Sequence, residues 1–228
     1  MRAWIAHHGL SALIHVGAWV PLALIIVDYA RDALTVNPIQ AVLSRTGKIS
    51  LVLLVITLAC TPLSTAFGWR AALRVRRALG LYGFGYAALH VATFVVLDYG
   101  LDLALIAQMI GEKYYILAGT AAFALLVPLA VTSTRRWQQR LGRHWRSLHR
   151  LIYLAVPLAV LHFALLVKSL LGHPEPLLWG AVVGVLLLLR LPPVRRQVSQ
   201  WRYAARCVLS RVSRLPAASL LHRRQNAP

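Results

Sequence analysis

The sequence has little charge for its length, and acidic residues are the scarcest kind. Of its 228 residues only 14% are charged, with 6 Asp and Glu against 25 Lys and Arg. In a soluble domain about a quarter of the residues are charged. This shortage, together with 59% hydrophobic residues and a mean hydropathy of +0.64, excludes an ordinary soluble domain and indicates a membrane protein.

Cysteine is also scarce, which excludes a small extracellular fold built on disulfides. Of the two cysteines, Cys60 falls in an apolar run and Cys207 in the basic C-terminal segment, so we expect no bond between them. The polar segments between the apolar runs are short as well. A soluble catalytic domain or nucleotide-binding domain therefore fits nowhere between them.

What the sequence does contain is a series of apolar runs long enough to cross a bilayer, which takes roughly 17 to 25 residues. They predict an all-α fold, a polytopic membrane helical bundle of about six transmembrane helices. We expect residues 1–195 to form this bundle and residues 196–228 to form a basic tail, first a helix on the membrane surface and then disordered. The apolar runs are residues 9–28, 48–67, 80–98, 115–133, 150–171 and 177–192.

The charges are distributed unevenly along the chain, and this predicts its orientation. Arginine-rich segments follow the second, fourth and sixth runs, whereas all six acidic residues fall at the opposite ends of the runs. By the positive-inside rule, both termini are expected in the cytoplasm. The net charge of +19 is then explained by topology and by attraction to anionic membrane lipid, so we expect no nucleic-acid partner.

The stretch GLYGFGYAALH, residues 80–90, matches the G-x-G-x-x-G/A pattern of a dinucleotide-binding turn. That turn has to follow a strand and open a helix. Here no strand pattern precedes the glycines, and they lie at the start of an apolar run. We therefore expect Gly80, Gly83 and Gly85 to permit close packing, either against a neighbouring helix or against a flat cofactor.

Two histidines are predicted at similar depth in different spans. His90 lies about 15 Å into the third run and His162 about 20 Å into the fifth, near the middle of the membrane at a rise of 1.5 Å per residue. Ionisable groups at this depth are costly and point to a function. Two neutral imidazoles on different helices are what six-coordinate haem iron needs. The alternative is that each histidine hydrogen-bonds a neighbouring helix.

Further candidates lie closer to the cytoplasmic side. His149 begins the fifth run and would suit a second cofactor, but the third run offers Arg76 and Arg77 at that level instead of a histidine. His149 could ligate with another partner, hydrogen-bond a second cofactor or meet lipid phosphate. The two arginines could pair with haem propionates or a flavin phosphate, or only set topology. His15 could pack or contact a quinone, but a core histidine whose hydrogen bonds are satisfied inside the bundle is the favoured interpretation.

With these residues in place, the chain resembles the MsrQ family, the haem-containing membrane subunit of the bacterial periplasmic methionine-sulfoxide reductase system. This family lies within the ferric-reductase-like transmembrane superfamily. The resemblance covers residues 8–195 and is carried by RRALGLYGFGYAALH, TSTRRWQQRLGRHWRSLHRLIYLA and LHFALLVK. On these motifs, the positions that match the family's haem histidines are His90, His149 and His162, and residues 1–195 would be its haem domain.

The resemblance implies an electron-transfer role in the bacterial inner (cytoplasmic) membrane. A quinol would supply electrons, which would pass through haem b and FMN to a periplasmic molybdenum-containing methionine-sulfoxide reductase, the partner in a heterodimer. The FMN contacts cannot be assigned from the motifs. The chain has no room for a fused dehydrogenase domain, so the donor is a quinol or a separate reductase, and the sulfoxide chemistry would belong to the partner.

Two other functions are alternatives to electron transfer. A small transporter or proton channel could use them as a relay, but the apolar runs supply no acidic partner for such a relay. A catalytically silent membrane anchor for a partner protein would not depend on them at all. A reducible haem absorption spectrum that requires the histidines would separate electron transfer from both.

Overall fold

The computed structural model describes residues 2–167, 172–198, 200, 201 and 203, and within these residues it contains helices and no strands. The all-α prediction is confirmed. The elements, in order, are α1 (Arg2–Ala30), α2 (Pro38–Phe67), α3 (Arg70–Ala92), the π-helix η1 (Thr93–Asp98), α4 (Leu103–Glu112), α5 (Tyr114–Val131), α6 (Arg135–Leu141), α7 (Arg143–Leu148), the 3-10 helix η2 (His149–Leu151), α8 (Ile152–Leu166) and α9 (Glu175–Leu188).

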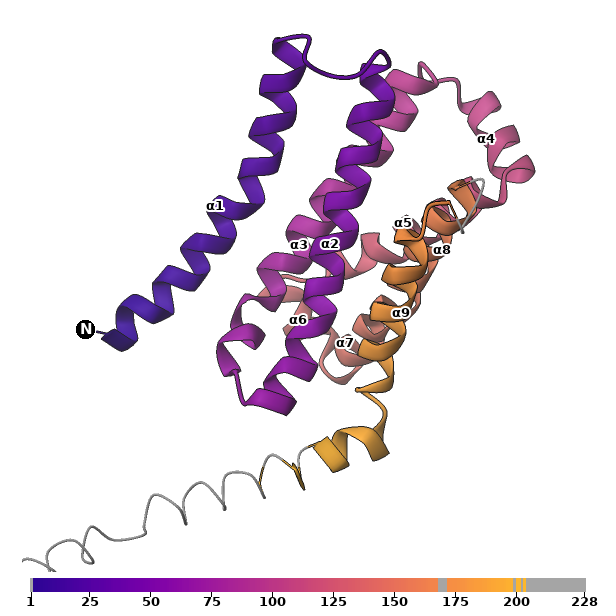
Figure 1. The fold of residues 1–228 in the computed structure, drawn as a ribbon. Helices are drawn as coiled ribbons and strands as arrows, with labels where there is room; N and C mark the ends of the chain where they lie inside the picture. Colours follow the sequence, from indigo (N-terminus) through magenta and orange to yellow (C-terminus); the bar gives the residue numbers. More distant parts are fainter. Residues whose placement is uncertain (1, 168–171, 199, 202, 204–228) are drawn as a thin grey trace, which may run out of the picture.

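The number of helices able to cross a membrane agrees with the predicted count. Among the described residues, five helices are long and apolar enough by themselves, and the count reaches six if Glu175–Leu188 and Pro192–Val198, bent by 80°, form one broken span. The N-terminus and the segment after α9 lie at the same end of the bundle (Figure 1). Assigning that end to the cytoplasm stays a prediction, and residues 204–228 of the expected basic tail lie outside the described residues.

The second and third spans begin earlier than their apolar runs. α2 starts at Pro38, where the side chain of Asn37 accepts a hydrogen bond from the backbone N–H of Gln40 and proline occupies the first turn. α2 ends at Gly68, whose φ of +72° is the left-handed conformation that glycine adopts readily. α3 then starts at Arg70. The prediction from residues 48 and 80 was wrong because the helices continue through charged residues, where an apolar run stops.

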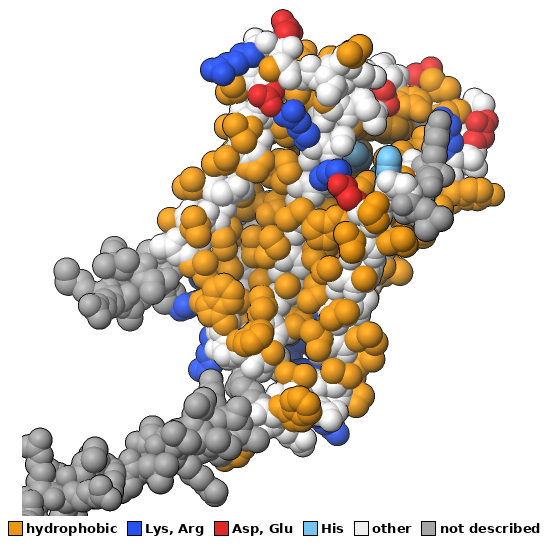
Figure 2. All heavy atoms as spheres, in the orientation of Figure 1, with side chains coloured by type: hydrophobic (Ala, Val, Ile, Leu, Met, Phe, Trp, Pro, Cys, Tyr) orange, Lys and Arg blue, Asp and Glu red, His pale blue; other side chains and the backbone are white. Residues whose placement is uncertain are grey.

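Two antiparallel hairpins form the centre of the molecule. α2 packs along α3, and α5 packs along α8, with α9 against α8 and α1 against α3 (Figure 1). The hairpins meet in an apolar core to which α2 contributes Leu54 and Leu58, α5 contributes Leu126, and α8 contributes Ala155 and Val156. The outer surface is also largely hydrophobic between its two ends, as expected for helices in lipid (Figure 2).

The two ends of the bundle differ in charge. Acidic side chains gather at the end that carries the α1–α2 connection (Figure 2). At this end Arg45 forms an ion pair with Asp28, and Lys48 forms one with Glu175 at 2.8 Å. The opposite end carries the arginines of α6 and α7. We refer to these as the acidic end and the arginine-rich end.

Candidate functional site

The fold brings His90 and His162 together. His90 comes from the end of α3 and His162 from the end of α8, so each hairpin contributes one imidazole. Their ring centroids are 6.1 Å apart and their planes are inclined by 82°. The pairing that the sequence predicted is therefore present in the geometry.

Both rings are held by the same kind of hydrogen bond. Nδ1 of His90 donates to the backbone oxygen of Leu43 at 2.9 Å, and Nδ1 of His162 donates to the backbone oxygen of Tyr115 at 2.6 Å. A carbonyl only accepts, so the neutral imidazole carries its proton on Nδ1 and keeps the lone pair of Nε2 free. This is the arrangement that metal-binding histidines usually have.

Two glycines give the rings the space that they occupy. A Cβ atom added to Gly47 would lie 3.1 Å from Nδ1 of His90, and one added to Gly119 would lie 2.7 Å from Nδ1 of His162. Any side chain at Gly119 would therefore displace the ring. We did not identify either glycine from the sequence, because small residues are common in membrane helices and each faces its histidine only in three dimensions.

The two halves of the site are related by an internal repeat. In each hairpin the histidine lies 47 residues after the carbonyl that it binds. Leu43 corresponds to Tyr115, Gly47 to Gly119 and His90 to His162, all at one interval of about 72 residues along the sequence. We recognised no internal repeat from the sequence, since few positions outside this set are identical.

The histidine pair lies nearer to the acidic end of its helices than to their other end. His90 is about 12 Å from Asp98 and His162 about 6 Å from Leu166, taking 1.5 Å per residue to the end of each candidate span. The other ends are at Arg70 and Arg143, earlier than the predicted starts at residues 80 and 150. The position of the pair near the middle of the membrane stays a prediction.

The donor set identifies the kind of metal group that fits here. Two imidazoles on opposite sides of one metal ion, with bonds of about 2.0–2.1 Å, hold their ring centroids about 6 Å apart. The observed 6.1 Å agrees with this spacing. The described residues contain no cluster of three or more His, Cys, Asp or Glu that could hold a metal ion. The pair therefore fits a metal whose remaining ligands come from a macrocycle, as in haem.

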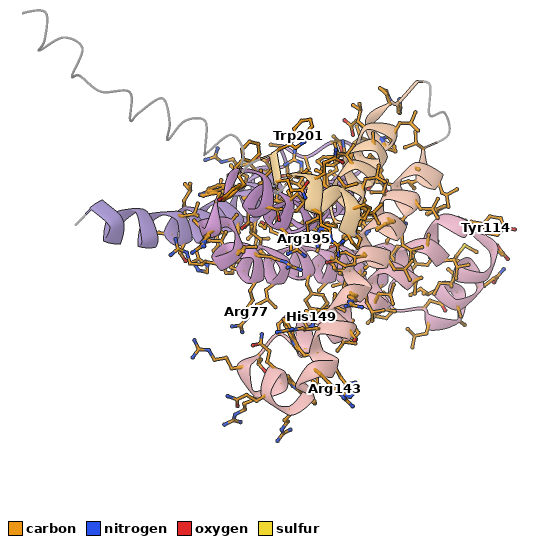
Figure 3. All side chains as sticks on the ribbon, turned by 90° about the horizontal axis from the view of Figure 1, so that it is seen from below. Arg77, Tyr114, Arg143, His149, Arg195 and Trp201 are labelled. Atoms are coloured by element: carbon orange, nitrogen blue, oxygen red, sulfur yellow. The ribbon has the colours of Figure 1, made fainter. Side chains whose placement is uncertain are left out.

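A cavity of about 500 Å³ lies between the same two hairpins toward the arginine-rich end. It is lined by His149 and by four arginines, Arg76, Arg77, Arg146 and Arg150. Arg77 and His149 lie next to each other when the bundle is viewed from this end (Figure 3). The structure thus brings Arg76, Arg77 and His149 together, as the sequence suggested, but it separates them from the histidine pair.

His149 is fixed by the neighbouring turn. Its Nδ1 lies 3.2 Å from the backbone oxygen of Trp145, and the two rings have centroids 4.0 Å apart. Nε1 of Trp145 in turn donates to the backbone oxygen of Thr132 at 2.9 Å, which anchors α7 to the end of α5. His149 is therefore held at the wall of the cavity by the turn that precedes it.

The internal repeat explains why the cavity has one histidine rather than two. At the interval that relates the halves of the histidine pair, His149 corresponds to Arg77, and Leu126 corresponds to Leu54. All four residues line the cavity. The first hairpin has arginine where the second has histidine, so a second paired-histidine site cannot form here.

Other predicted residues have local partners. Nδ1 of His15 lies 2.7 Å from the hydroxyl of Tyr82, which satisfies it within the bundle. A Cβ atom on Gly83 would lie 3.0 Å from Leu54, so this glycine permits close helix packing. Gly80 lines the cavity, but a Cβ atom on Gly85 would meet nothing within 4 Å. Close packing of Gly85 against a neighbouring helix is therefore wrong, and its packing against a flat cofactor stays a prediction.

Fold and site together define a polytopic membrane protein in which two helical hairpins hold a pair of histidines suited to a haem. This is the ferric-reductase-like class: residues 46–160 match the family described as "Ferric reductase like transmembrane component". Within this class the chain belongs to the MsrQ family, as the motifs had suggested. No solved structure matches the chain.

The family assignment rests on relatives that match most of the chain. A protein of Rhodospirillum rubrum is 42% identical over 188 residues, which are 82% of this chain and 89% of the relative. Proteins of Xanthomonas axonopodis pv. citri (44% over 183 residues, 78% and 83%) and Caulobacter vibrioides (39% over 189 residues, 82% and 89%) are similar. Each of these relatives is named "Protein-methionine-sulfoxide reductase heme-binding subunit MsrQ".

Proposed function

We propose that this chain is the haem-binding membrane subunit of a protein-methionine-sulfoxide reductase system and passes electrons to a catalytic partner. The observation that carries the proposal is the pair His90 and His162, with free Nε2 atoms and ring centroids 6.1 Å apart. The names of the relatives support the same role. The chain is then an electron-transfer component, and the sulfoxide chemistry belongs to the partner.

In this proposal His90 and His162 would hold haem b through their Nε2 atoms. When bound, the haem supplies one-electron redox chemistry at its iron. Each Nδ1–H bond to a backbone carbonyl fixes the orientation of a ring and makes the coordinating nitrogen more basic. Gly47 and Gly119 allow the rings to lie close against α2 and α5, so both imidazoles keep their positions when the charge at the iron changes.

The cavity at the arginine-rich end is the candidate site for FMN. Its volume of about 500 Å³ is within the usual range for small cofactors, about 300–1,000 Å³. Arg76 and Arg77, on adjacent positions of α3, can bind a phosphate through charge-assisted hydrogen bonds. His149 would contact the same cofactor. Arg77 in place of a histidine favours an anionic organic cofactor here over a second haem with two histidine ligands.

The direction of electron flow follows from the predicted orientation. With the arginine-rich end in the cytoplasm of a bacterium and the acidic end in the periplasm, the histidine pair lies near the periplasmic side of the inner membrane. A quinol would deliver electrons to the chain, and a periplasmic molybdenum-containing reductase would receive them at the acidic end. A proton channel is less well supported, because Nδ1 of both paired histidines is bound to a backbone carbonyl.

The test is spectroscopic and uses the full-length protein purified from membranes. We expect a reducible b-type absorption spectrum, a haemochrome count of one haem per chain and extractable FMN. His90→Ala and His162→Ala should each abolish the haem spectrum, whereas His149→Ala should retain it and lose FMN. His15→Ala is the matched control in another span and should retain both. Normal haem content in the first two variants would contradict the assignment.

A further inference from the structure

Arg190 inserts its guanidinium group between α2 and α8, a position that the residues around it do not predict. One terminal nitrogen donates to the backbone oxygen of Leu58, and the other donates to the hydroxyl of Tyr153. Its Cζ atom lies 4.9 Å from the centroid of the Tyr153 ring. The arginine that follows α9 is therefore fixed by three separate interactions.

A proline explains why the backbone oxygen of Leu58 is available. In a regular helix this oxygen would accept the N–H four residues later, but that position is Pro62, which has no N–H. An unpaired buried carbonyl is costly, and Arg190 supplies the missing donor. The interaction fixes the partly buried guanidinium group between α2 and α8, next to the ring of Tyr153.

The positive charge of Arg190 has no acidic partner among the residues that the structure describes. Its partners are a carbonyl and a phenol, and its buried Nε has no hydrogen bond. Because the guanidinium is partly buried, its charge polarises the groups that it contacts more than it would in bulk water. The group most directly affected is the Tyr153 hydroxyl, which accepts from Arg190 and keeps its own proton to donate.

Tyr153 also lines the cavity that we assign to FMN. It lies four residues after His149, and both side chains line this cavity. The corresponding residue of the first hairpin is Leu81, which lines the cavity too but has no hydroxyl. The polarised donor is therefore present on one side of the cavity only.

We propose that Tyr153, polarised by Arg190, donates a hydrogen bond to a carbonyl oxygen of the flavin ring in the cavity. Negative charge increases on the flavin when it is reduced, so this bond would stabilise the reduced form and raise the midpoint potential. Tyr153 keeps its proton, and no reaction step is added. The inference rests on the proposed function, because it assumes that the cavity holds FMN.

The experiment compares Tyr153→Phe with wild type in the full-length purified protein. The measurements are FMN content per chain and a redox titration followed at the flavin and haem absorption bands. Loss of a charge-assisted hydrogen bond should lower the equilibrium constant for two-electron reduction about tenfold, a shift of about 30 mV to more negative potential. FMN content and the haem potential should stay as in wild type.

Two further variants make the result specific. Tyr82→Phe removes a hydroxyl that contacts His15 in α1, and it should leave the flavin potential unchanged. Arg190→Gln keeps an N–H for the carbonyl of Leu58 but removes the charge, and it should shift the potential in the same direction as Tyr153→Phe.

The outcomes separate the inference from the proposed function. If FMN is present and Tyr153→Phe shifts its potential no more than Tyr82→Phe does, the inference is wrong and the proposed function stands. If the wild-type protein binds haem but no FMN, the assignment of the cavity is wrong, and the inference fails with it.

Discussion

The two ends of the interface between the hairpins follow the same repeat but have opposite character. At the acidic end the histidines and the glycines that lie against them are identical: His90 matches His162, and Gly47 matches Gly119. At the arginine-rich end they differ, since Arg77 matches His149. The first arrangement suits a group that is bound equally from both faces. The second suits an anionic molecule with distinct sides, so one scaffold supplies two different kinds of site.

The largest effect is expected at Gly119, at the acidic end, because this glycine lies closest to its histidine. Gly119→Ala places a Cβ atom 2.7 Å from Nδ1 of His162, so the ring must move and its bond to the carbonyl of Tyr115 is disturbed. Overpacking of this kind costs about 1–3 kcal/mol, roughly a tenfold or greater loss of haem affinity. Haem retained per chain through purification measures it.

The equivalent change in the first hairpin should be milder. Gly47→Ala places its Cβ atom 3.1 Å from His90, a contact that a small shift of the ring can relieve. Gly85→Ala is the matched control, because its Cβ atom meets nothing within 4 Å. A Gly119→Ala protein that retains as much haem as the Gly85→Ala control would contradict the packing argument.

A substitution at Arg77 can make the arginine-rich end resemble the acidic end, where both hairpins carry a histidine. Arg77→His places an imidazole opposite His149 at the related position of the cavity. We expect FMN content to fall about tenfold or more, because a charge-assisted phosphate contact is removed. We also expect haem content to rise from one toward two per chain, measured by haemochrome assay. Arg74→His on the same helix controls for the added histidine, and an Arg77→His protein that keeps its FMN would contradict our assignment of the cavity.

The sequence predicts the individual histidines better than it predicts their surroundings. His90 and His162 are conspicuous because an imidazole is costly in an apolar span, and that cost depends only on the local sequence. Gly47 and Gly119 could not be identified in the same way, because their role depends on which ring lies against them. The helical class follows from run length alone, whereas the span starts at Pro38 and Arg70 do not, because helices continue through charged residues.

The arginine-rich end shows a second limit of local reasoning. Arg76, Arg77 and His149 were identified as candidates, but their grouping in one cavity depends on how the two hairpins pack. Arg190 was missed altogether. Its partner is a carbonyl left free by Pro62, and a backbone oxygen 132 residues away leaves no mark in the sequence around the arginine. The ligands of the cavity stay a prediction.

A smaller effect is expected where the two hairpins differ in internal packing. Gly83 of α3 corresponds to Ala155 of α8. A methyl group added to Gly83 would lie 3.0 Å from the side chain of Leu54, whereas Ala155 already carries a methyl group. Gly83→Ala should lower the free energy of unfolding by about 1–3 kcal/mol through overpacking. Ala155→Gly should lower it by about 1 kcal/mol through helix propensity. Thermal unfolding in detergent measures both, and Gly85→Ala should cause no loss. Equal stability of the Gly83→Ala and Gly85→Ala proteins would contradict this packing difference.

The smallest effect is expected at the surface of the acidic end. Lys48 follows Gly47 directly and pairs with Glu175 at 2.8 Å, but both side chains are about half exposed, at 51% and 54%. Exposed ion pairs contribute at most about 1 kcal/mol and are weakened by salt. Lys48→Gln should therefore leave the haem spectrum unchanged and lower the thermal midpoint slightly at low ionic strength only. A large loss of haem in this variant would show that the histidine pair depends on the charge of Lys48 and not only on packing and backbone hydrogen bonds.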